Sequence, residues 1–125
     1  MATTLATFYT IQQQEQEDNK ATFQLALNPH HAIYEGHFPH QPVMPGVCML
    51  QLVTELTAQA LGLDLQLKKA SQAKFLVPIV PQQFPQIQLI THYQASAEQE
   101  WKVTASIQVE KQVFFKFKGL LALQS

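Results

Sequence analysis

Alternating polar and apolar residues dominate this chain and predict strands. The clearest case is Ala21–Leu27, where Phe23, Leu25 and Leu27 alternate with small or polar residues. A period of two is typical of a strand that buries one face. The same kind of pattern predicts further strands over residues 7–14, 71–77, 87–94, 101–110 and 112–123, with a polar turn at 15–19.

One stretch has the pattern of a helix instead. Residues 46–61 are apolar at most positions, and Gly62 follows as a stop signal. The apolar side chains cover nearly the whole circumference of a helix, which is typical of a buried helix. Two strands, one long helix and four strands predict an α+β fold over a single domain, residues 1–125. One sheet wrapped around the helix leaves an open side, so we expect at least a dimer.

A proline-rich loop leads into this helix. Pro39, Pro42 and Pro45 recur every three residues, and His37 follows Gly36. An imidazole with a pKa near 6.5 can take up and return protons at neutral pH. The start of a helix offers unpaired N–H groups and a partial positive charge. The loop therefore places a candidate proton-transfer group beside a candidate anion-stabilising group.

The motif G-H-F-P-H-Q-P-V-M-P-G-V at 36–47 resembles the signature of the β-hydroxyacyl-acyl carrier protein dehydratases. The segment A-K-F-L-V-P-I-V-P at 73–81 is similar to the second block of that family. The resemblance implies the hot-dog fold, an antiparallel sheet wrapped around one long buried helix. It also implies a β-hydroxyacyl substrate carried on the phosphopantetheine of an acyl carrier protein or on coenzyme A, with no other cofactor.

The resemblance assigns roles to individual residues. His37 matches the catalytic base, and the amides of Gly46 and Val47 match the donors to the substrate carbonyl. Gly36 and Phe38 flank the base and are expected beside the substrate. One face of the helix is expected either to line an acyl tunnel or to form plain core, and its residues are Val47, Leu50, Val53, Thr54 and Thr57.

Two helix positions depart from the family pattern. Gln51 stands where the family carries Glu or Asp, and Glu55 stands where the family commonly has Gln. An amide can hold a hydroxyl group but cannot act as a general acid. Residues four apart share a helix face, so one hypothesis is that Glu55 partly replaces the missing carboxyl group. The alternative is a buried structural carboxyl group that bonds Gln51, Thr54 or backbone.

This exchange leaves three functions open. The first is dehydration of a β-hydroxyacyl thioester, in fatty acid synthesis or a related lipid or polyene route. The second is a catalytically impaired subunit that binds acyl thioesters or completes the site of another hot-dog subunit in a heterodimer. The third is an acyl thioesterase in which Glu55 activates water, although the retained G-H-F-P loop argues against it.

Composition and charge limit the kinds of partner and ligand expected for this chain. The net charge is −1 and arginine is absent, so nothing points to nucleic acid or to bidentate phosphate binding. Lysines 68, 69 and 74 are candidates to attract an acidic carrier protein. Cys48 is the only cysteine; it is expected to be a small buried apolar residue, and the alternative is a nucleophile activated by the helix start. The histidine spacing matches no metal pattern, and no signal peptide or membrane span is expected, which favours the cytoplasm.

Overall fold

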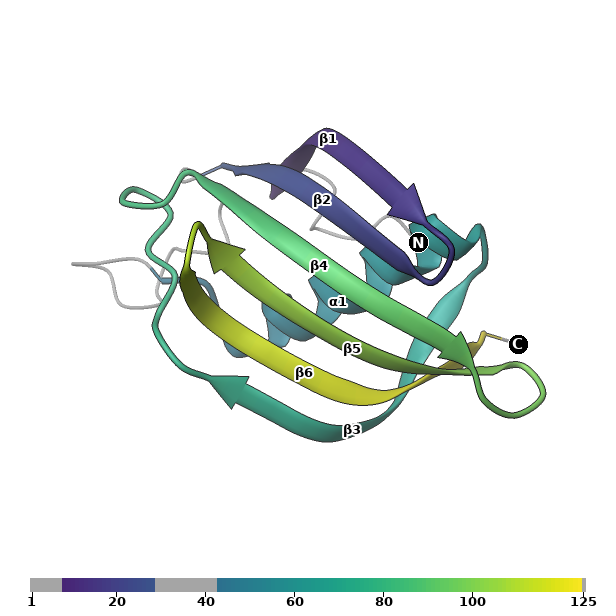
Figure 1. Cartoon of the computed structure of the whole chain (residues 1–125). Helices are drawn as coiled ribbons and strands as arrows, with labels where there is room; N and C mark the ends of the chain where they lie inside the picture. Colours follow the sequence, from purple (N-terminus) through teal and green to yellow (C-terminus); the bar gives the residue numbers. More distant parts are fainter. Residues whose placement is uncertain (1–7, 29–42, 125) are drawn as a thin grey trace.

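The structure, a computed structural model, describes residues 8–28 and 43–124. Its elements follow the order expected from the sequence, with two strands before the helix and four after it (Figure 1). The strands and the helix are β1 (Tyr9–Glu17), β2 (Lys20–Leu27), α1 (Gly46–Leu61), β3 (Leu65–Phe75), β4 (Gln86–Ala95), β5 (Glu100–Val109) and β6 (Gln112–Leu123).

The six strands form one antiparallel sheet in the order β1-β2-β4-β5-β6-β3. The helix lies across one face of this sheet (Figure 1). Alternate residues of the central strands point toward the helix and are buried, as Leu89 of β4 and Ile107 of β5 show. The α+β arrangement with a sheet curved around one helix is therefore confirmed.

The helix begins and ends where the sequence signals predict. It starts directly after Pro45, and Gly62 follows its last residue with a φ of 70°, in the left-handed region. Gly62 and Leu63 donate their backbone N–H groups to the carbonyls of Gln59 and Ala58. These two bonds satisfy carbonyl groups that the end of a helix would otherwise leave unpaired.

Two strand predictions were wrong in their bounds. β1 continues to Glu17, through most of the predicted turn, because residues 13–17 pair with β2 while their side chains remain exposed. β3 begins at Leu65 and ends at Phe75, whereas the pattern predicted a strand over 71–77. Two register shifts interrupt β3, between Leu67 and Lys69 and between Ala70 and Gln72, so its sequence carries no regular alternation.

Within this chain, the helix is buried on one side only. Val47 keeps 66% of its surface exposed, and Gln51, one turn later, is exposed as well. The sheet covers only one side of the helix, where Leu52, Val53 and Leu56 are fully buried. The opposite side is the open side that a partner subunit was expected to cover.

Candidate functional site

The start of α1 presents two backbone amides that have no acceptor within the helix. Pro45 precedes the helix in an extended conformation, and no described side chain caps the helix start. The carbonyl of Pro45 accepts the N–H groups of Cys48 (3.0 Å) and Met49 (3.4 Å). The amides of Gly46 and Val47 come one turn too early for such bonds. They can therefore donate to a negatively charged or polarised oxygen at this point.

The ring of Phe75, at the end of β3, forms a wall beside these amides. A Cβ atom on Gly46 would lie 3.0 Å from two atoms of that ring, so a glycine is what allows the ring to lie so close. Phe75 stacks on Phe115 with ring centroids 4.9 Å apart, yet 52% of Phe75 is exposed. An exposed aromatic ring next to free amides can pack against the apolar part of a substrate.

Backbone bonds hold the surrounding segments together. Met44, just before the helix, donates to the carbonyl of Ile79 (2.8 Å). Leu76 and Val77 both donate to the carbonyl of Phe114, at 2.8 and 3.3 Å. The helix start is thereby fixed to the segment that follows β3, which is the second block of the motif. Residues about thirty positions apart in the sequence thus form one site.

Gln51 and Glu55 lie on the same side of the helix but in different surroundings. Gln51 is exposed, whereas Glu55 is half-buried against the start of β1. The Tyr9 hydroxyl donates to Oε1 of Glu55 over 3.3 Å, and Oε2 of Glu55 is buried with no hydrogen-bond partner among the described residues. Burial, the charge of Glu55 and this hydrogen bond together raise the pKa of Tyr9 well above its usual range, so the phenol stays protonated.

The structure brings some of the predicted site residues together and leaves others aside. Gly46 and Val47 lie together at the helix start, and Leu50 and Thr54 are half-exposed on the accessible side. Val53 and Thr57 are fully buried against the sheet, so within this chain they form core, which was the alternative to a tunnel lining. His37, Gly36 and Phe38 lie outside the described residues.

Cys48 is not placed to act as a nucleophile. Only 2% of the residue is exposed, and burial raises the pKa of its thiol. The helix-start effect that lowers a thiol pKa is therefore outweighed by desolvation. Within 8–28 and 43–124, no group of three or more His, Cys, Asp and Glu residues could hold a metal ion.

Two residues of the site were not assigned from the sequence. Phe75 belonged to the quoted second block, so its position in the motif was a usable signal. Tyr9 had no signal, because its contact with Glu55 spans 46 positions of the chain. Only the pairing of β1 with β2 brings it to the helix.

A family model for the ApeI dehydratase matches residues 12–118, which is most of the chain. The chain belongs to the ApeI-like dehydratase family. The matched range includes the helix start, Gln51 and Glu55. No helix in the described part of the chain is long and apolar enough to cross a membrane.

Three proteins with similar sequences are dehydratases as well. A 3-hydroxyacyl-[acyl-carrier-protein] dehydratase FabZ from Bordetella petrii is 33% identical over 109 residues, covering 74% of this chain and 68% of the relative. A FabZ from Anaeromyxobacter sp. is 29% identical over 121 residues, covering 86% and 76% respectively. One from Rickettsia bellii is matched over only 57% of its own length.

Solved structures show the fold. A chain of the dehydratase heterocomplex ApeI:P from Xenorhabdus doucetiae superposes with a TM-score of 0.68 at 23% identity, covering 90% of this chain and 96% of that one. A Staphylococcus aureus thioesterase, SAV0944, gives a TM-score of 0.69 at 13% identity, covering 97% and 98%. The fold is the hot-dog fold, as the motif implied. Because dehydratases and a thioesterase share it, the fold alone does not select the reaction.

Proposed function

We propose that this chain removes water from a 3-hydroxyacyl thioester and gives the trans-2-enoyl thioester. Membership of the dehydratase family carries the proposal, and the free amides of Gly46 and Val47 beside the exposed ring of Phe75 supply a chemical reason. These amides would bind the thioester carbonyl oxygen. That oxygen gains negative charge when the neighbouring carbon loses its proton, which is the step an amide donor accelerates.

His37 would remove the proton from the carbon next to the carbonyl. The bond from the β-carbon to the hydroxyl oxygen then breaks, and that oxygen leaves as water after it accepts a proton. Gln51 can hold the hydroxyl group in place but cannot supply the proton. The protonated His37 can return the proton that it removed, so one residue would serve as both base and acid.

The exchange of Gln51 and Glu55 gives a direct test. The substrate is a 3-hydroxyacyl-acyl carrier protein, and mass spectrometry follows the loss of one water from the acyl chain. Gln51→Glu restores a carboxyl group where the family has one, and a positioned proton-transfer group is worth ~10²–10⁴-fold in rate. We expect Gln51→Glu to dehydrate at least about tenfold faster than the wild type, and His37→Ala to lose the activity.

Glu55→Gln separates the two carboxyl hypotheses. Unchanged dehydration and binding in Glu55→Gln mean that Glu55 has no catalytic role. The double variant Gln51→Glu with Glu55→Gln reproduces the usual family order and serves as the control for both single changes. Inactivity of the wild type and of every variant would reject dehydration of this substrate.

A second function is favoured by one specific observation, the amide at position 51. The chain would then bind acyl thioesters, or complete the active site of another hot-dog subunit, without efficient catalysis of its own. The similar structure from Xenorhabdus doucetiae is a dehydratase heterocomplex, ApeI:P, which supports an assembly with a different subunit. Activation of an inert wild type by Gln51→Glu alone would support this function over the first.

A further inference from the structure

Polar side chains cross the outer face of the sheet, which is the face opposite the helix. In β5 and β6 exposed residues alternate with buried ones, so Lys102, Thr104 and Lys118 point away from the helix. Strand pairing sets Thr104 beside Lys118, and it sets Leu120 of β6 between Lys102 of β5 and Lys69 of β3. Three lysines from three neighbouring strands therefore surround Leu120.

The edge strand β3 is bent and lies unusually close to β6 at this point. Register shifts interrupt β3 on both sides of the pair Lys69 and Ala70. A Cβ atom on Gly119 of β6 would lie 2.2 Å from the carbonyl oxygen of Lys69, so only a glycine allows the two backbones to approach in this way. Bulges turn side chains in a new direction and are frequent beside functional sites.

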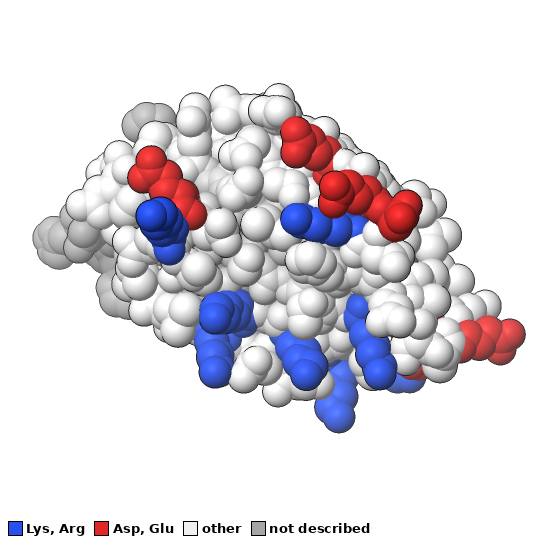
Figure 2. Space-filling view, viewed as in Figure 1, with Lys and Arg blue, Asp and Glu red and all other residues white. Residues whose placement is uncertain are grey.

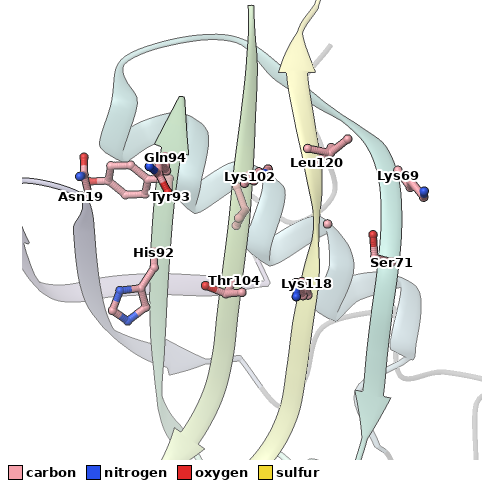
Figure 3. Close-up of a pocket in the computed structure, with 12 residues that line it drawn as sticks. Asn19, Lys69, Ser71, His92, Tyr93, Gln94, Lys102, Thr104, Lys118 and Leu120 are labelled. Carbon is pink, nitrogen blue, oxygen red and sulfur yellow. The ribbon is translucent and has the colours of Figure 1, made fainter. Parts of the chain in front are cut away.

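The four strands β3, β4, β5 and β6 form a hollow of about 500 Å³ here, which we call the outer hollow. Its wall contains the three lysines, and its other polar side chains include Ser71, His92 and Thr104 (Figure 3). Among the described residues, no carboxyl group lines it. The outer hollow therefore combines positive charge with groups that can donate hydrogen bonds.

The charges of the three lysines are not neutralised within the described part of the chain. The ion pair found there joins a different lysine, Lys68, to Glu100. After residue 64 the only acidic residues are Glu98, Glu100 and Glu110, in or next to the β4–β5 and β5–β6 turns. Figure 2 shows most of the lysine atoms gathered over β5, β6 and β3, with acidic atoms at the margins. An anion bound between the lysines would therefore offset their mutual repulsion.

We infer that the outer hollow is a second binding site, for a ligand that carries two or more linked phosphates. Lysine binds phosphate as a point charge on a flexible stem. Neighbouring strands lie about 4.8 Å apart and alternate residues about 7 Å apart, so the backbones of the three lysines stand roughly 8 to 10 Å from one another. Linked phosphates can reach lysines on both sides of Leu120, and the hydroxyl groups of Ser71 and Thr104 can donate to further phosphate oxygens.

The outer hollow is separate from the candidate active site. It lies on the side of the sheet away from the helix, whereas the free amides and Phe75 lie at the helix start. A ligand in the outer hollow would therefore not occupy the place proposed for the thioester, and the inference goes beyond the proposed function. A second copy of the chain is a poor occupant, because a two-fold axis at the hollow would set the lysines against themselves.

The test titrates pyrophosphate into the purified chain by calorimetry at several salt concentrations. The variant is Lys102→Gln with Lys118→Gln, and the control is Lys74→Gln with Lys116→Gln. Both remove two exposed positive charges from the outer face, but Lys74 and Lys116 pair with each other and do not line the outer hollow. At low salt we expect the variant to bind at least about tenfold more weakly, and the control to change less than about threefold.

A second arm distinguishes a soluble ligand from a lipid headgroup. Vesicles of phosphatidylcholine with and without cardiolipin, a lipid with two phosphates, are sedimented with the protein. Cardiolipin-dependent binding that pyrophosphate displaces, and that Lys102→Gln with Lys118→Gln loses, would assign the outer hollow to a headgroup. Binding of pyrophosphate without binding of either vesicle would assign it to a soluble ligand.

Three results would overturn the inference. The first is absence of pyrophosphate binding at low salt, whether or not the vesicles bind. The second is equal weakening in the two double variants, which would show a general attraction to the lysines of the outer face. The third is sulfate binding as tight as that of pyrophosphate, since a single anionic group would then suffice. Each result leaves the proposed function as it stands, because binding is measured without a thioester substrate.

Discussion

At the scale of single residues, the carboxyl group of Glu55 is held from one side only. Tyr9 donates to Oε1 over 3.3 Å, and within residues 8–28 and 43–124 the buried Oε2 has no hydrogen-bond partner. A buried unpaired oxygen costs free energy, and such sites often reflect a functional role or a ligand. Gln51 lies one turn earlier on the same side of the helix and is exposed, so the two residues differ in their access to a substrate.

Tyr9 has a testable effect on stability. Replacing the donor with Phe leaves both oxygens of Glu55 without a partner, so Tyr9→Phe should lower the free energy of unfolding by about 1–3 kcal/mol at pH 7. Burial, and then Glu55, raise the pKa of Tyr9 in the folded state above the ordinary value near 10. The stabilisation is therefore fully present below about pH 10 and is lost as the pH rises further.

Urea unfolding of the wild type and Tyr9→Phe between neutral pH and about pH 11 checks this, since the gap between the two should narrow only above about pH 10. Tyr93→Phe is the control, because Tyr93 lies elsewhere and its hydroxyl accepts from Gln16. Parallel curves for the wild type and Tyr9→Phe over the whole range would contradict the role of Tyr9 ionisation.

The candidate site could be predicted where its residues are close in sequence or belong to one of the two motifs. The spacing of Pro45, Gly46 and Val47 predicts the free amides at the helix start, because helix geometry is local. The contact of Tyr9 with Glu55 could not be predicted, since it depends on how β1 pairs with β2 and where the helix crosses them. The burial of Thr57 could not be predicted from the sequence either, because a threonine side chain occurs both in protein cores and in the walls of tunnels.

At the scale of elements, a hydrogen bond between two threonines joins the helix to the sheet. Thr57 of α1 and Thr91 of β4 are both fully buried, and their hydroxyl oxygens lie 2.8 Å apart. A buried hydroxyl without its partner is costly, whereas replacing both hydroxyls with methyl groups of the same shape is close to neutral. This pair therefore specifies the position of the helix on the sheet more than it stabilises the fold.

A double-mutant cycle measures that distinction. Thr57→Val and Thr91→Val should each lower the free energy of unfolding by about 1–3 kcal/mol, and the double variant should cost no more than either single one. Thermal or urea unfolding provides the values. Additive losses in the double variant would show that the two hydroxyl groups do not act as a pair.

Some elements were easier to predict than others, for physical reasons. β2 and α1 each bury one regular set of side chains, so their apolar residues recur with the period of a strand or a helix. β3 is an edge strand with two bulges, and nearly all its side chains are exposed. Burial imposes no pattern on such a strand. Neither its bounds nor its lysines on the outer face could therefore be derived from periodicity.

At the scale of the whole molecule, apolar surface remains exposed at the end of the edge strand β3. Val47, Phe75 and Leu76 are 66%, 52% and 50% exposed. Phe75 lies against Gly46, so these side chains gather where the helix start meets the end of β3. Exposed apolar side chains that cluster beside a polar site are typical of an interface. The same place holds the free amides, so a partner subunit there would enclose the candidate site.

We therefore expect the purified chain to self-associate through this surface, and Val47→Asp to prevent it. Burying a side chain such as Val or Phe contributes about 1.5–3 kcal/mol, and a two-fold contact counts each substitution twice. The dissociation constant should rise at least about 100-fold, since each 1.4 kcal/mol is a factor of ten. Sedimentation velocity over a range of concentrations measures it. Leu63→Asp is the control, because Leu63 is also exposed but lies beyond the other end of the helix. A wild type that stays monomeric at all concentrations, or a Val47→Asp variant that associates like Leu63→Asp, would show that two copies do not meet at this surface.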